Sequence, residues 1–150
     1  MSEGQARERV FIDASVWIAA SASPEGGSSV SLEICQGKRY MAVCSQRVLM
    51  EAQTNIRHKM PIAALVRFYE LLAAVGPEIV SEISAEEEEA WADVVAPKDA
   101  HVLAAAVIGR ANYLLTLDRK HLANDTLRAA VAPLQVLLPG EFIHRVMPKT

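Results

Sequence analysis

The stretch Val10-Phe11-Ile12-Asp13-Ala14-Ser15 places a carboxylate directly after three consecutive apolar residues. The segment 10–16 is short and almost continuously apolar, which is typical of a strand buried on both faces of a parallel sheet. A carboxylate beside a core is costly unless a cation, a proton or hydrogen bonds compensate for it. Asp13 is therefore a candidate binding residue at the end of the first expected strand.

Three more acidic residues stand at an end of an apolar segment. Glu51 follows Val48-Leu49-Met50, Asp99 opens the run to Leu103, and Asp118 follows Leu114-Leu115-Thr116-Leu117. Singly, the four acids could be ordinary turn, helix, cap and loop residues. Their shared placement favours one site for a hard divalent cation, Mg²⁺ or Mn²⁺, because such ions prefer oxygen ligands.

The remaining apolar segments alternate between strand-like and helix-like patterns. Strands are expected at 10–16, 40–44, 79–83, 113–117 and 134–138, and helices at 29–36, 46–59, 61–74 and 99–110, with a last short helix from 139. Strands separated by helices predict a parallel sheet covered on both faces. Ligands of such sheets bind beyond the carboxyl ends of the strands. Asp13 and Asp118 fall at these ends, and Glu51 and Asp99 lie on helices that could reach the same edge.

Length and composition limit the class of protein. The 150 residues, 51% hydrophobic and 22% charged, predict a single domain over 1–150, with 1–8 as a flexible tail. A net charge of −3 argues against a wholly basic nucleic-acid binder but leaves room for a local basic groove. Residues 1–9 show no apolar core of a signal peptide, and no run approaches the roughly 18 apolar residues of a membrane span.

Two local patterns have plain structural explanations. Ser84-Ala85-Glu86-Glu87 forms a capping box, so the acidic run 86–89 is expected to be a solvated helix start. Cys35 and Cys44 match no zinc spacing, and free buried thiols in a reducing cytoplasm are expected.

The four acidic segments together resemble the PIN-domain nucleases. Phe11-Ile12-Asp13-Ala14-Ser15 resembles their opening strand, and Ser45 through Glu51 resembles their serine-started helix with its glutamate. The segments 99–106 and 113–122 resemble the third and fourth acidic motifs of the family, in the family's order. Pro139-Gly140-Glu141-Phe142 is similar to its closing segment, so the resemblance spans roughly residues 9–144.

This resemblance implies a three-layer α/β/α sandwich with a central, mainly parallel five-stranded sheet. It also implies a Mg²⁺- or Mn²⁺-dependent endoribonuclease that cuts single-stranded regions of RNA. Many members of this size are VapC-like toxins, so a cognate antitoxin and a homodimer are expected. The alternatives are a PIN-like RNA-processing nuclease without an antitoxin and a non-catalytic interaction module. The sequence departs from common family patterns in two places. Ala96 stands where many members have an aspartate, and Arg119 and Lys120 follow the fourth motif where some have another acid.

The site residues are then given roles. Asp13 and Asp99 are expected to bind the metal directly, and Asp118 directly or through water. Glu51 is expected to bind a second ion or to orient the attacking water. Ser15 and Thr116 could hold these carboxylates by hydrogen bonds, or could be a turn hydroxyl and an ordinary strand residue.

Several polar residues near the acids could contact the substrate. Arg47 and Asn55 share one helix face with Glu51 and could bind a phosphate, although a solvated face explains them equally well. Arg119 and Lys120, with His121, could flank a substrate groove. His101 projects from another side of its helix than Asp99 and is expected to be a packing or surface residue.

Overall fold

The computed structural model describes residues 7–147, and its centre is one parallel sheet. The strands, in the order β3-β2-β1-β4-β5, are β1 (Glu8–Ile12), β2 (Tyr40–Cys44), β3 (Glu78–Ile79), β4 (Tyr113–Leu115) and β5 (Gln135–Leu137). All four pairings are parallel. The predicted parallel five-stranded sheet is confirmed.

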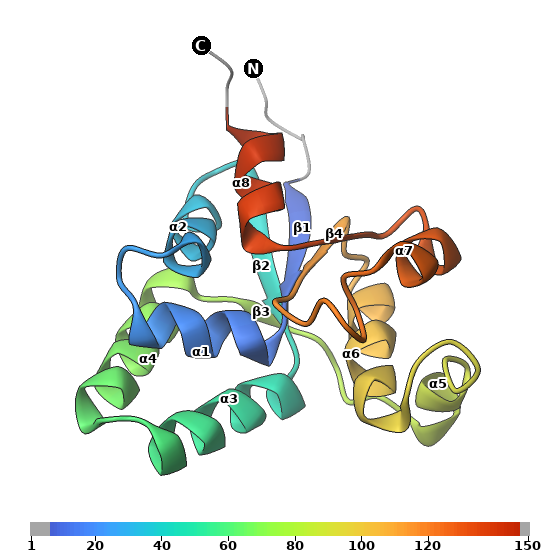
Figure 1. Cartoon of the computed structure of the whole chain (residues 1–150), viewed down its shortest axis with the longest axis horizontal. Coiled ribbons are helices and arrows are strands. Elements are labelled where there is room, and N and C mark those ends of the chain that lie inside the picture. The colour runs from blue at the N-terminus through green and yellow to red at the C-terminus, as the bar shows by residue number, and fades with distance from the viewer. Residues whose placement is uncertain (1–6, 148–150) are drawn as a thin grey trace.

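Helices cover both faces of this sheet. They are α1 (Ala14–Ala22), α2 (Gly27–Ile34), α3 (Gln46–Lys59), α4 (Ile62–Val75), α5 (Ala85–Glu89), α6 (Pro97–Ile108), α7 (Asp125–Val131) and α8 (Pro139–Val146). Figure 1 shows α1 to α4 on one side of the sheet and α5 to α7 on the other, which gives the expected three layers. Helix α8 packs against α2 and β5.

The chain reverses its direction of winding between two neighbouring strands. Strand β1 is followed by β2 and β3 on one side, whereas β4 and β5 lie on the other. Strands β1 and β4 pair directly, with Val10 opposite Tyr113 and Ile12 opposite Leu115. A ligand crevice is expected at such a reversal, beyond the carboxyl ends of the strands.

Some element boundaries differ from the sequence-based expectation. Strand β1 ends at Ile12 and not at Val16, because the Asp13 carboxylate accepts a hydrogen bond from the Ala14 N–H and begins helix α1. Strand β3 has only two residues, although the Val80 N–H still donates to the Cys44 carbonyl. Helices α1 and α7 were not predicted. Of the expected tail, residues 1–6 lie outside the described part, and Glu8 belongs to β1.

The core lies where both helical layers meet the sheet. Its largest buried side chains include Phe11, Trp17, Phe68 and Phe142. Trp17 packs edge-on against Phe68, with ring centroids 6.1 Å apart, so α1 and α4 are joined by an aromatic contact. Trp17 therefore has a packing role in the core. Among the described residues no helix has the length and apolar character needed to cross a membrane.

Both cysteines are free and buried, as expected. Burial raises the pKa of Cys35 and of Cys44 to about 12. Both thiols are therefore neutral packing groups at physiological pH.

Gly109 allows the end of α6 to approach the sheet. A Cβ at this position would lie 2.7 Å from Val80 Cγ1 and 3.0 Å from Val43 Cγ1. The Gly109 carbonyl also accepts a hydrogen bond of 2.6 Å from Arg9 Nε. Any side chain at this position would push the end of α6 away from β2 and from the chain after β3.

We expect Gly109→Ala to lower the free energy of unfolding by about 1–3 kcal/mol, the usual cost of overpacking. Urea unfolding followed by circular dichroism measures the change. Gly140→Ala is the matched control, because no atom lies within 4 Å of a Cβ built there. Equal stability of the two variants would mean that the contact of Gly109 with Val43 and Val80 is not tight.

Candidate metal centre

Asp13 is fixed at the sheet edge by hydrogen bonds to both of its carboxylate oxygens. Its Oδ1 accepts from the Ala14 N–H at 2.8 Å, and its Oδ2 accepts from Thr116 Oγ1 at 2.8 Å and from Ser15 Oγ at 3.1 Å. The side chain is 8% exposed. Burial raises the pKa of Asp13, and these hydrogen bonds oppose the rise only in part.

The two hydroxyls that hold Asp13 also hold the chain after β4. Ser15 Oγ accepts from the Leu117 N–H at 3.0 Å, and Thr116 Oγ1 accepts from the Asp118 N–H at 3.1 Å. Each hydroxyl therefore donates to Asp13 and accepts from the backbone beside Asp118. This relay places the ends of β1 and β4 in a defined position relative to one another.

Asp118 is held by the turn that it begins. Its Oδ1 accepts from the His121 N–H at 2.9 Å, and its Oδ2 lies 3.1 Å from His121 Nδ1. Burial by itself would raise the pKa of Asp118. The contacts with the backbone and ring of His121 outweigh burial and hold this pKa below its usual value. Asp118 is therefore the carboxylate most readily ionised in this cluster.

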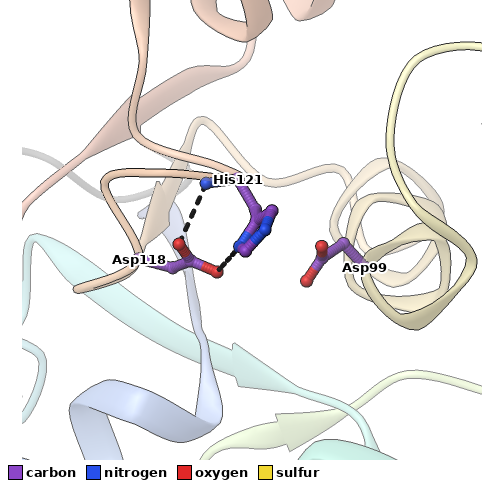
Figure 2. A group of neighbouring side chains, drawn as sticks. All are labelled: Asp99, Asp118 and His121. Carbon is purple, nitrogen blue, oxygen red and sulfur yellow. Dashed lines mark hydrogen bonds and ion pairs between the residues drawn. The ribbon is translucent and has the colours of Figure 1, made fainter.

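Asp99 lies in the first turn of α6 and is 8% exposed. Its Oδ2 is buried and has no hydrogen-bond partner among the described residues. Burial raises the pKa of Asp99, Lys98 opposes the rise and the charge of Asp118 adds to it. Figure 2 shows the Asp99 carboxylate directed from α6 toward Asp118 and His121.

Glu51 interacts electrostatically with the other acids, although it is exposed at the surface of α3. Burial of its carboxyl group raises its pKa, and the charges of Asp13 and Asp99 raise it further. The charge of Asp99 also raises the pKa of Asp13, and the charge of Asp118 raises the pKa of Asp99. The four predicted acids are therefore linked by electrostatic interactions.

One group has the spacing of ligands to a single ion. Oxygens of Asp99 and Asp118 and a ring nitrogen of His121 all lie within 4.8 Å of one another. Ligands at about 2.1 Å from one ion are separated by roughly 3–4 Å, so a small closure of this group would be enough. The partnerless Asp99 Oδ2 is a buried oxygen that a cation would satisfy. These residues therefore fit a divalent metal.

Sequence reasoning missed one residue and underrated another. Lys98 is near enough to lower the pKa of Asp99, Glu51 and Asp118, so a single cation serves three acids. His121 was expected only to flank the substrate, but it contacts Asp118 directly. Its position three residues after Asp118 is the available signal, because a turn begun by an aspartate brings that residue back to the carboxylate.

Other contacts of the four expected substrate-binding residues are visible in the structure. Arg47 forms an ion pair of 3.1 Å with Glu88, and the Asn55 amide donates to the Glu51 carbonyl of its own helix. Arg119 lines a separate hollow beside Gly27 and Glu141. Lys120 is exposed, and its carbonyl accepts from Asn124. Arg47 also lowers the pKa of Glu51.

Two other sequence-based expectations can be compared with the structure. The capping box at Ser84 is present, and Glu88 in the acidic run is the partner of Arg47. His101 is a buried residue of α6, 3% exposed, and it is not part of the group formed by Asp99, Asp118 and His121.

Comparison with known proteins agrees with this architecture. The PIN-domain family model matches residues 9–120, and the chain belongs to this family of nucleases. No match was found among curated protein sequences.

Solved structures with the same fold include three bacterial examples. Mycobacterium tuberculosis VapC20, a toxin that cleaves the sarcin-ricin loop, is 16% identical with a TM-score of 0.56 over 74% of this chain and 91% of its own. Rickettsia felis VapBC2, bound to a DNA fragment from its promoter, is 14% identical with a TM-score of 0.62. Neisseria gonorrhoeae FitAcB is 15% identical with a TM-score of 0.58. In both of these, 87% of this chain matches 98% of the other.

We expect Thr116→Val to lower the free energy of unfolding by about 1–2 kcal/mol at pH 7, because the Asp118 N–H loses its acceptor and Asp13 loses a donor. Part of this loss has a defined pH dependence. The Thr116 hydroxyl stabilises ionised Asp13, so the folded pKa of Asp13 is lower in the parent than in the variant. The stability that the variant loses in this way is therefore fully seen at pH values above the Asp13 pKa of both folded proteins. It disappears as the pH falls through these two pKa values.

Chemical unfolding at several pH values measures both effects. The exposed helix residue Thr54 provides the matched control, Thr54→Val, for which a change within about 0.5 kcal/mol is expected. An equal loss in the two variants would contradict the role of the Thr116 hydroxyl.

Proposed function

We propose that this protein is a divalent-metal-dependent endoribonuclease that hydrolyses phosphodiester bonds in single-stranded regions of RNA, and that it is the toxin of a toxin–antitoxin pair. The observation that carries the proposal is the cluster of Asp13, Glu51, Asp99 and Asp118 at the strand reversal of a PIN-domain chain. The resemblance to VapC-like toxins adds the choice of RNA as substrate.

Each residue of the cluster has a defined task in this proposal. Asp99 and Asp118 hold the metal, Asp13 adds a third carboxylate, and Glu51 orients the attacking water or holds a second ion. Ser15 and Thr116 fix Asp13 through their hydroxyls. Lys98 lies where it can attract a phosphate of the substrate. When bound, Mg²⁺ or Mn²⁺ would polarise the phosphate and would make a bound water more acidic.

We also propose a protein partner and a homodimer. Ile62, Val66 and Tyr69 follow one another at helical spacing on α4 and are 78%, 53% and 46% exposed. Covering such an apolar stripe with an antitoxin or with a second copy of the chain would remove apolar surface from water, which is favourable. Free buried thiols are consistent with action in the cytoplasm.

The direct test of activity uses a pool of structured RNAs with Mn²⁺, Mg²⁺ or EDTA. We expect cleavage only with a metal, and a loss of roughly a hundredfold or more in Asp13→Asn and Asp99→Asn, which corresponds to about 3 kcal/mol of barrier. Asp125→Asn is the matched control, because this aspartate lies fully exposed at the start of α7. Cleavage that is equal in all variants would identify a contaminating nuclease.

Metal binding is also expected to stabilise the fold. Clustered carboxylates repel one another, and a cation that binds only the folded chain stabilises it by mass action, by about 2.7 kcal/mol at a hundred times its Kd. Millimolar Mn²⁺ should therefore raise the Tm by several degrees in a thermal-shift assay. The rise should be small in Asp99→Asn and unchanged in Asp125→Asn. An unmoved Tm in the parent would argue against a preformed site.

A further inference from the structure

We propose that His121 is a metal ligand beside Asp99 and Asp118, and that its ring nitrogen makes this site prefer Mn²⁺ over Mg²⁺. The inference rests on the proposed metal-dependent function and specifies the ion. It concerns a residue outside the four acids.

The position of His121 supports this assignment. A ring nitrogen of His121 and oxygens of Asp99 and Asp118 form the group within 4.8 Å, whereas Asp13 and Glu51 are not members. The imidazole is 36% exposed, so its ring is not enclosed by the core. Figure 2 shows the ring between the two carboxylates, which approach it from α6 and from the loop after β4. No other histidine of residues 7–147 belongs to such a group.

The carboxylates of the group are unequally satisfied. Asp118 has a partner on each oxygen, both supplied by His121. Asp99, on the opposite side, has a buried Oδ2 without a partner. A cation between Asp99 and the pair of Asp118 and His121 would satisfy this oxygen.

The donor set determines which ion is favoured. Mg²⁺ binds oxygen ligands and retains several waters, and it gains little from an imidazole. Mn²⁺ also favours carboxylate oxygen, but as an ion of the first transition series it binds an imidazole nitrogen more strongly than Mg²⁺ does. Two carboxylates and one imidazole therefore select Mn²⁺ over Mg²⁺, whereas a purely carboxylate site would not gain this preference.

A positioning role is the main alternative for His121. Its Nδ1 lies 3.1 Å from Asp118 Oδ2 and could simply orient that carboxylate. His121→Asn separates the two roles, because asparagine offers an amide N–H to Asp118 but has no ring nitrogen. A ligand role predicts that the variant loses nitrogen coordination, whereas a positioning role predicts that nothing changes at the ion.

The experiment is pulsed electron paramagnetic resonance of the full chain loaded with Mn²⁺. We expect ¹⁴N couplings from one imidazole in the parent, their loss in His121→Asn and their retention in His144→Asn. His144 lies on α8 in a separate hollow with Gly140 and Arg145, so it is a matched control. Calorimetric titration should show the ratio of the Mg²⁺ Kd to the Mn²⁺ Kd falling about tenfold or more in His121→Asn.

Each other outcome has a defined meaning. Bound Mn²⁺ without nitrogen coupling in the parent overturns the ligand assignment and leaves the proposed nuclease function standing. Coupling that survives in His121→Asn also overturns it, as does an unchanged ratio of the two Kd values. If the parent binds no Mn²⁺, both the assignment and the metal dependence of the proposed function fail. If His121→Asn does not fold, His121→Gln takes its place, because glutamine likewise has no ring nitrogen.

Discussion

The direct pairing of β1 with β4 is the constraint on which the candidate site depends. It brings Asp13 beside the chain that follows β4, which lies more than 100 positions later in the sequence. The repulsion that results between the carboxylates is opposed by the backbone N–H groups of Ala14 and His121, by the hydroxyls of Ser15 and Thr116, and by Lys98. A bound cation would oppose it further.

The hydroxyls of Ser15 and Thr116 convert a strand pairing into a site of fixed geometry. Each donates to the Asp13 carboxylate and accepts from the backbone next to Asp118, so neither strand end can shift without breaking two hydrogen bonds. Thr116 is fully buried, which makes its bonds expensive to lose. The same hydrogen bonds therefore hold the strand ends in place and fix the Asp13 carboxylate.

The predictable part of the structure followed from strong local patterns. Apolar runs bounded by turn residues located every strand, and Ser45 with its following pattern located α3 within its observed bounds. Helix α1 was missed because Val16-Trp17-Ile18 continues the apolar run of β1 with no break in character, and only the Asp13 cap separates the two elements. His121 was underrated because its contact with Asp118 arises from the turn geometry, which its sequence spacing only suggests.

Few positive charges act on the four acids of the cluster. Lys98 lowers the pKa of three acids, and Arg47, which is paired with Glu88, lowers that of Glu51. One lysine cannot neutralise four carboxylates, and the buried Asp99 Oδ2 has no hydrogen-bond partner among the described residues. A fold stabilised only by its core would gain from replacing these acids with neutral residues. Their presence together near the ends of β1 and β4 is consistent with a cation that offsets the repulsion, as the proposed function requires.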